Sequence, residues 1–272
     1  MKITFLGTAA AEGFPALFCK CEYCNEARRL RGKNVRTRSQ SLINDDLLID
    51  FSADTYHHFL ENEIFGDKVK YLFVTHAHSD HFYPNDLSFR DGCYAHYPEV
   101  ESLQVFSGKA VGEALKDNPH VSKNVFFNEL EAFKPVKLKE YTVTPFPARH
   151  MLETDALFYL IQGEKTLLYA HDTGYFYDEV FEYLEKNRIR IDFATFDCTN
   201  VDLPISDAGT HMGIPNIMRV CQRLEQIGAI DEKTVKVINH FSHNANPIHH
   251  KLEERMAGTG FLVAYDGMTV EF

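Results

Sequence analysis

The chain is organised around one short loop, His76-Ala77-His78-Ser79-Asp80-His81. The run before it, residues 71–75, is apolar and rich in aromatic and β-branched side chains, which predicts a buried strand. The run after it, residues 82–85, contains a proline and favours a turn. Three imidazoles and a carboxylate therefore stand in a loop that a core strand holds in place, which is a common setting for a functional site.

The residue types in this loop predict a metal centre. Imidazole and carboxylate groups are preferred ligands of zinc, manganese and iron. Alternate residues of an extended chain point the same way, so His76 and His78 can bind one ion. Asp80 and His81 then face a different direction and can bind a second ion. The alternative is a polar surface loop that contains histidines by chance, and the density of ligand-type residues disfavours it.

Length and charge limit the classes of function. The 272 residues have ordinary globular composition and a net charge of −11, which argues against extended binding of nucleic acid. A small anionic substrate remains compatible, because bound metals would dominate the local field. The apolar runs are too short to span a bilayer, and the N-terminus has no signal-peptide pattern, so we expect a cytoplasmic protein without membrane contact. A homodimer is left open.

Strand patterns dominate the two ends of the chain, with helical patterns between them. This alternation predicts two mixed sheets covered by outer helices, in a single domain over residues 1–272. The close of the chain predicts a hairpin across the turn Asp266-Gly267. The other expected strands are 2–6, 41–43, 47–49, 103–106, 141–145, 157–161, 166–169, 192–196 and 235–239, and the expected helices are 55–62, 109–115, 177–186 and 214–227.

Further ligand-type residues stand where other strand patterns end. His150, Asp172 and His240 each follow an apolar run. Taken with the central loop, they are the best candidates to complete the metal centre. His171 lies beside Asp172, would point to the opposite face of the strand, and is the weaker choice.

A cysteine cluster forms a second, separate signal. Cys19, Cys21 and Cys24 give the spacing C-x-C-x-x-C, which brings three thiolates close enough for one tetrahedral zinc. His243 is our candidate for the fourth ligand. This predicts a structural zinc site on a loop at about residues 15–30, and the alternative is a buried or redox-active cysteine cluster. The remaining cysteines, Cys93, Cys198 and Cys221, are interpreted as small core residues.

The central loop has the form H-x-H-x-D-H and resembles the metallo-β-lactamase superfamily. This resemblance implies an αββα sandwich, with an α/β (α+β) fold of two mixed sheets flanked by helices, and a site for two metal ions. It assigns His76, His78 and His150 to one ion. It assigns Asp80, His81 and His240 to the other, with Asp172 as the bridging ligand.

Several features together narrow the resemblance to the PhnP-type phosphoribosyl cyclic phosphodiesterase family. They are the cysteine spacing, the central motif, the late H-x-x-H and the closing residues 260–268. This resemblance implies hydrolysis of cyclic phosphodiesters on two catalytic ions, manganese or zinc, and a structural zinc on Cys19, Cys21, Cys24 and His243. It adds His211 as a catalytic residue, and Asp80 would also orient the attacking hydroxide.

The predicted function is therefore a metal-dependent phosphodiesterase. Its substrate would be a small cyclic diester such as phosphoribosyl 1,2-cyclic phosphate. One alternative is a thioesterase or lactonase on the same metals. Another is a cofactor-maturation protein, since residues 7–15 also resemble the pyrroloquinoline quinone biosynthesis protein B family, which lacks the full histidine motif. A tRNA-processing nuclease is the least favoured, because the acidic chain shows no RNA-gripping arm.

Overall fold

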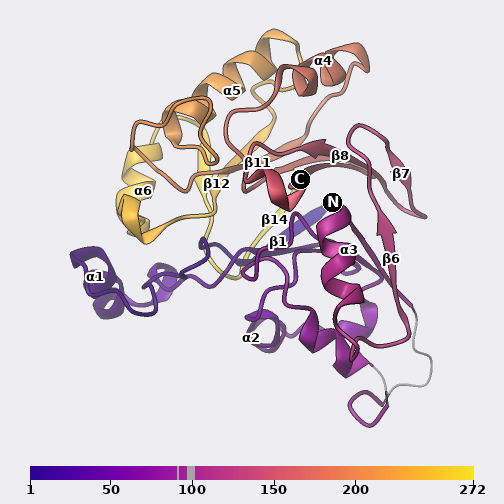
Figure 1. Cartoon of the computed structure of the whole chain (residues 1–272). Coiled ribbons are helices and arrows are strands. Elements are labelled where there is room, and N and C mark those ends of the chain that lie inside the picture. Colours follow the sequence, from indigo (N-terminus) through magenta and orange to yellow (C-terminus); the bar gives the residue numbers. More distant parts are fainter. Residues whose placement is uncertain (91, 97–101) are drawn as a thin grey trace.

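Two seven-stranded sheets form the centre of the molecule (Figure 1). The computed structural model describes residues 1–90, 92–96 and 102–272. The first sheet has the order β14 (Met268–Glu271), β1 (Lys2–Gly7), β2 (Gln40–Ile43), β3 (Leu47–Ile49), β4 (Tyr71–Phe73), β5 (Leu103–Ser107) and β6 (Val125–Glu129). The second sheet has the order β13 (Phe261–Val263), β12 (Val235–Asn239), β11 (Phe193–Asp197), β10 (Thr166–Ala170), β9 (Leu157–Gln162), β8 (Thr142–Pro147) and β7 (Val136–Lys137).

The alternation of side chains along each strand builds the core between the two sheets. Ile3 and Phe5 of β1 lie in one buried cluster with Tyr159 and Ile161 of β9. Leu6, which points to the other face of the strand, joins a separate cluster. A side chain buried in this way stabilises the fold by roughly 1.5–3 kcal/mol, so the inner layer supplies much of the stability of the sandwich.

Helices cover the outer face of each sheet and complete the four layers (Figure 1). Val180, Ile217 and Leu252 of these helices lie in one cluster with the outer side chains of the second sheet. Val111 belongs to the corresponding cluster on the first sheet. The predicted αββα sandwich of two mixed sheets is therefore confirmed. The helices over the second sheet are α4 (Asp178–Lys186), α5 (Ile214–Gln226) and α6 (His249–Met256), and those over the first are α2 (Thr55–Glu61) and α3 (Lys109–Lys116).

One edge of the sandwich collects the loops that carry ligand-type residues. Strands β3 to β6 run parallel to one another, as do β10 to β13. The carboxyl ends of parallel strands meet at one edge of a sheet, which is where ligands commonly bind in such folds. The loops after β4, β10 and β12 carry the central motif, Asp172 and His240 respectively.

The predicted hairpin at the end of the chain is wrong, because its two strands belong to different sheets. β13 pairs with β12, whereas β14 pairs with β1. The buried carboxylate of Asp266 explains the crossing. It accepts hydrogen bonds from the Thr8 hydroxyl and from both the amide and the hydroxyl of Thr37, each at 2.6 Å. These contacts hold residue 266 against the first sheet, so the Asp-Gly pair joins two sheets.

Two α-helices of the described residues, α1 (Glu22–Leu30) and α6, were not predicted from the sequence. The first, α1, buries only Cys24 and Ala27, so it lacks a broad apolar stripe. The Cys21 sulfur caps its start and accepts a hydrogen bond from the Cys24 amide at 3.4 Å. This helix therefore depends on the cysteine loop before it. The second helix that was not predicted is α6.

None of the helices in the described part of the chain is long and apolar enough to cross a membrane. The 13 residues of α5 compare with roughly 20 that a spanning helix needs.

Candidate metal centre

Three predicted histidines converge at one end of the site. His78 Nδ1 lies 2.9 Å from His76 Nε2 and 3.3 Å from His150 Nε2. His76 and His78 come from the loop after β4, and His150 follows β8. Their ring nitrogens lie within 4.8 Å of one another, so the three imidazoles could share one cation.

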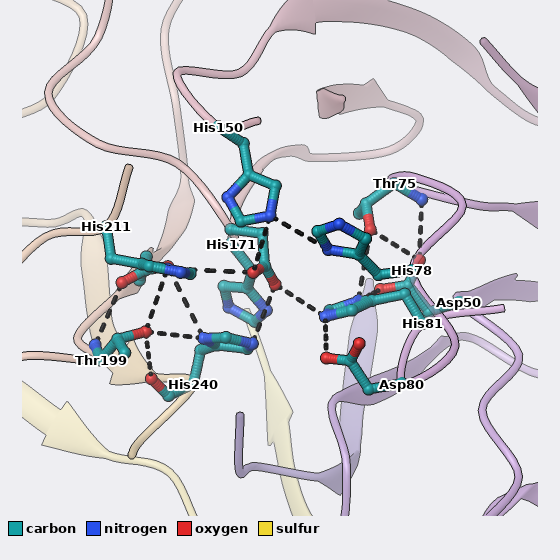
Figure 2. Close-up of polar contacts among 12 residues, drawn as sticks. Asp50, Thr75, His78, Asp80, His81, His150, His171, Thr199, His211 and His240 are labelled. Atoms are coloured by element: carbon teal, nitrogen blue, oxygen red, sulfur yellow. Dashed lines mark hydrogen bonds and ion pairs between the residues drawn. The ribbon is translucent and has the colours of Figure 1, made fainter. Parts of the chain in front are cut away.

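The other predicted ligands meet around Asp172. Figure 2 shows His81 and His240 on either side of the site, with Asp80 beside His81. Asp172 Oδ2 lies 2.8 Å from His81 Nε2 and 2.8 Å from His240 Nε2. Asp80 approaches His81 Nε2 to 3.2 Å. The second oxygen of Asp172 lies 4.0 Å from His150 Nε2, so this carboxylate stands between the two groups of imidazoles. The structure thus brings all seven predicted ligands into one site.

Buried atoms without hydrogen bonds indicate where a cation fits. His81 Nε2, His240 Nε2 and Asp172 Oδ2 are buried and have no hydrogen-bond partner among the described residues. They nevertheless approach one another closely, so they face a common point. Leaving such groups unpaired is costly, and a divalent ion would satisfy all three at once. This donor set of imidazoles and carboxylates fits zinc or manganese.

Two groups of the site, Asp172 and His76, have the ionisation states that suit a metal ligand, whereas nearby carboxylates raise the pKa of His81 and of His240. Burial opposes ionisation of Asp172, but the neighbouring His240 and His81 outweigh it and hold the pKa of the carboxyl well below its usual range. Burial, together with His81, holds the pKa of His76 well below its usual value, so this ring is neutral. A neutral imidazole and an ionised carboxylate are the forms that bind metals.

His211 also reaches the site. Its Nδ1 lies 2.9 Å from Asp197 Oδ2 and 3.8 Å from Asp172 Oδ1. Burial disfavours its protonation, but Asp197 outweighs burial and raises the pKa of His211 to about 9. His211 was predicted from the family resemblance and from its place before α5. The structure shows that Asp197, which is fully buried, is its direct partner.

Sequence reasoning missed Asp197. Its Oδ1 accepts the backbone amides of Thr199 at 3.0 Å and Met212 at 3.2 Å, while Oδ2 engages His211. The Thr199 hydroxyl lies 2.8 Å from His240 Nδ1. Asp197 could have been found from its place at the end of a buried strand, because a similar position identified Asp172 as a candidate.

The model of the Beta-lactamase superfamily domain matches residues 46–241, which is more than half of the chain. The chain belongs to the metallo-β-lactamase superfamily. A relative within the curated proteins is ribonuclease Z of Listeria monocytogenes serotype 4a (strain HCC23), at 26% identity over 165 residues. That alignment covers 57% of this chain and 47% of the relative, so the match spans about half the length of the ribonuclease.

Solved structures share the fold over the whole length of this chain. A diphosphatase of the PhnP family has a TM-score of 0.75 and 21% identity, over 100% of this chain and 97% of that one. Zinc-bound PqqB from Methylobacterium extorquens has a TM-score of 0.75 and 18% identity, over the full length of both chains. The short form of human tRNase Z has a TM-score of 0.66 and 13% identity, over 100% of this chain and 99% of that one. At these identities the likeness concerns the fold.

Asp50 is another buried carboxylate, and it lies behind His81, one of the candidate ligands. Its Oδ2 lies 2.7 Å from His81 Nδ1, and its Oδ1 accepts the Thr75 amide at 2.7 Å. A carboxylate on the far nitrogen of a ligand imidazole holds the ring in place and leaves Nε2 free for the ion. Asp50 directly follows β3 and was not predicted from sequence.

Replacing Asp50 with asparagine is expected to weaken metal binding by about 10- to 100-fold, the usual effect of losing such an outer partner. The change keeps the volume of the side chain but removes the charge that faces His81. Competition with a metal chelator measures the affinity. Asp45→Asn, on the exposed hairpin beside Lys2, is the matched control. Equal affinities in the two variants would contradict the assigned role of Asp50.

The cysteine cluster lies apart from this centre, on the loop before α1 and in the first turn of that helix. Cys19, Cys21, Cys24 and His243 have ligand atoms within 4.8 Å of one another. Burial opposes ionisation of Cys21, but hydrogen bonds with His243 and the Cys24 amide lower its pKa to about 6. The cysteines of the described residues are unpaired, and three sulfurs with one imidazole form a donor set that suits tetrahedral zinc.

Two minor predictions have separate outcomes. Cys198 and Cys221 are buried as expected, but Cys93 is exposed, so its interpretation as a core residue is wrong. His171 is fully buried, and its Nε2 lies 2.8 Å from the Thr195 hydroxyl. It therefore faces a neighbouring strand, in line with its ranking as the weaker ligand.

Proposed function

We propose that this chain is a binuclear metal-dependent phosphodiesterase that acts on a small cyclic diester such as phosphoribosyl 1,2-cyclic phosphate. The observation that supports it most strongly is the position of Asp172, which stands between two groups of imidazoles and within 3.8 Å of His211. One ion would be held by His76, His78 and His150, and the other by Asp80, His81 and His240. Asp172 would bridge the two.

Each group has a defined task in this proposal. When bound, the ions lower the pKa of the attacking water and neutralise charge on the phosphoryl oxygens. Asp80 orients the attacking oxygen. Asp197 engages Nδ1 of His211, which leaves Nε2 to donate a proton to the leaving oxygen or a hydrogen bond to the phosphoryl group.

The small size of the substrate follows from charge. The chain carries −11 overall, and a polyanionic nucleic acid would be repelled outside the metal centre. A compact diester needs only the local positive field of the ions. The likeness to ribonuclease Z supports the phosphodiester chemistry, and the charge favours the smaller substrate over RNA.

Substrate profiling tests this proposal. The purified protein, loaded with manganese or zinc, is incubated with a ribose cyclic phosphodiester, an aryl phosphodiester, a thioester and a lactone. We expect turnover of the diesters. Turnover confined to the thioester or lactone would favour the alternative hydrolase. Full metal loading without turnover of any ester would favour a cofactor-maturation protein.

We also propose a structural zinc on Cys19, Cys21, Cys24 and His243, with zinc–sulfur distances of about 2.3 Å. The ion would tie the N-terminal loop to the segment after β12. The donor set supports this, because three cysteines and one histidine leave no open position for a substrate.

Cys19→Ser is expected to lower the melting temperature by several degrees while the catalytic ions remain bound. A closed zinc site contributes folding energy, and each kcal/mol lost lowers the melting temperature of a domain of this size by roughly 2–4 °C. Calorimetry with metal analysis measures both effects. The exposed Cys93→Ser is the control. Unchanged stability with loss of a catalytic ion would show that the two sites had been confused.

A further inference from the structure

We infer that Arg149 is a positioning residue that joins the loop carrying His150 to the loop carrying Asp172. The inference rests on the metal centre proposed above and extends it to a residue outside the ligand set. Arg149 immediately precedes His150, and it contacts the segment that follows Asp172 with both its backbone and its side chain.

The backbone of Arg149 pairs with the Asp172 loop. Its amide donates to the Thr173 hydroxyl at 3.0 Å, and its carbonyl accepts the Gly174 amide at 2.9 Å. These two bonds join the loops within two residues of His150 and of Asp172. Thr173 and Gly174 lie in the loop after β10, so this pairing defines where the segments that carry His150 and Asp172 meet.

The side chain of Arg149 extends the same contact. Its Nε donates to the Tyr175 carbonyl at 3.0 Å, and its guanidinium lies 4.1 Å from the centre of the Tyr177 ring. An arginine stacked on a ring in this way is attracted to the face of the ring and stabilises the contact. Arg149 thus holds the chain from Thr173 to Tyr177 along its own loop.

The His211 loop packs on this pair of loops. A Cβ atom placed on Gly174 would lie only 1.8 Å from the Gly209 carbonyl oxygen, so the two loops meet without room for a side chain. The far side of the His211 loop is held by Arg219, whose Nη1 lies 2.8 Å from Asp207. The position of Gly174, set by Arg149, therefore also affects the approach of His211.

Loss of the Arg149 contacts should affect some of the candidate ligands more than others. His150 and Asp172 depend on the Arg149 contacts, whereas the other ligands come from the loops after β4 and β12. Displacement of His150 would weaken the ion held by His76, His78 and His150 most. Errors of about 1 Å in such a site can cost about 100-fold in rate.

The test compares Arg149→Met with a matched control, Arg223→Met. Arg223 also stacks on a ring, at 4.0 Å from the centre of Phe181, and pairs with Asp178. It lies on α5 and interacts with the Tyr175 side chain, but among the described residues it contacts none of the predicted ligands. Cobalt titration followed by visible absorption resolves the two binding steps and reports the coordination of each ion. Calorimetry gives the melting temperature, and kcat and KM are measured on an aryl phosphodiester.

For Arg149→Met we expect one cobalt step to weaken by about 10- to 100-fold, with a fall in kcat and little change in KM. The control should match the wild type in both steps. Thr173→Val keeps the shape of the side chain but removes one Arg149 contact, and should change the same step in the same direction. If Arg149→Met does not fold, Thr173→Val alone tests the inference.

Three results would overturn the inference. The first is wild-type cobalt affinity at both steps in Arg149→Met and Thr173→Val. The second is an equal loss at both steps that merely follows a lower melting temperature. The third is a wild-type protein that binds no ions at this centre, which would remove the proposed metal centre itself and is distinguished by the wild-type titration alone.

Discussion

Asp172→Asn should reduce hydrolysis of a phosphodiester by at least about 10³-fold, since the ions contribute several kcal/mol of charge stabilisation in the transition state. Asp172 is buried between His81 and His240, and its Oδ2 lies 2.8 Å from Nε2 of each histidine. Asparagine keeps the shape but removes the negative charge that a bridging ligand provides. Metal content, turnover and the melting temperature are measured on the same preparation.

The control for this substitution is Asp178→Asn, at the start of α4, where the carboxylate pairs with Arg223 on the surface. We expect near wild-type turnover and full metal content in the control. If Asp172→Asn retained both ions and more than a tenth of wild-type turnover, Asp172 would not be the bridging ligand.

His211→Ala should reduce turnover by about 10²-fold or more while both ions stay bound, which is the usual scale for losing one acid–base or oxyanion contact. The imidazole is not in the ligand set, and it reaches the site from the loop before α5. Asp197→Asn should act in the same direction, because it removes the partner 2.9 Å from His211 Nδ1. The kinetics are interpreted together with metal content.

A double variant that combines His211→Ala with Asp197→Asn tests whether the two residues act together. If Asp197 acts through His211, the double variant should be no slower than His211→Ala alone, because the two residues form one unit. Multiplicative losses would show that Asp197 acts independently, for example through His240, whose Nδ1 lies 3.6 Å away. Near-normal turnover of His211→Ala with full metal loading would remove His211 from the mechanism.

The sequence predicted the layers of the fold, and it pointed to the residues that the structure brings together at the candidate site, because both depend on local patterns. Alternating side chains show which strand faces are buried, and the central motif places four ligand-type residues within six positions. His150, Asp172 and His240 could then be found as ligand-type residues at strand ends. The structure brings all of them together, although their assignment to two ions stays a proposal.

Other features depend on contacts between distant segments, which no local pattern contains. Asp50 and Asp197 gain their roles only when a histidine from another loop, His81 or His211, arrives beside them. The closing strands look like a hairpin locally, but contacts of Asp266 with Thr8 and Thr37 divide them between two sheets. In each case the role of a buried carboxylate depends on a partner from a distant part of the sequence.

The most direct test of the proposed function is metal analysis of the purified protein, paired with hydrolysis of an aryl phosphodiester before and after chelation. We predict two ions at the catalytic centre and one zinc on the cysteine cluster. Removal of the catalytic ions should abolish hydrolysis, and manganese or zinc should restore it. Hydrolysis that persists in metal-free protein, or a fully loaded protein that cleaves no phosphodiester, would contradict the proposal.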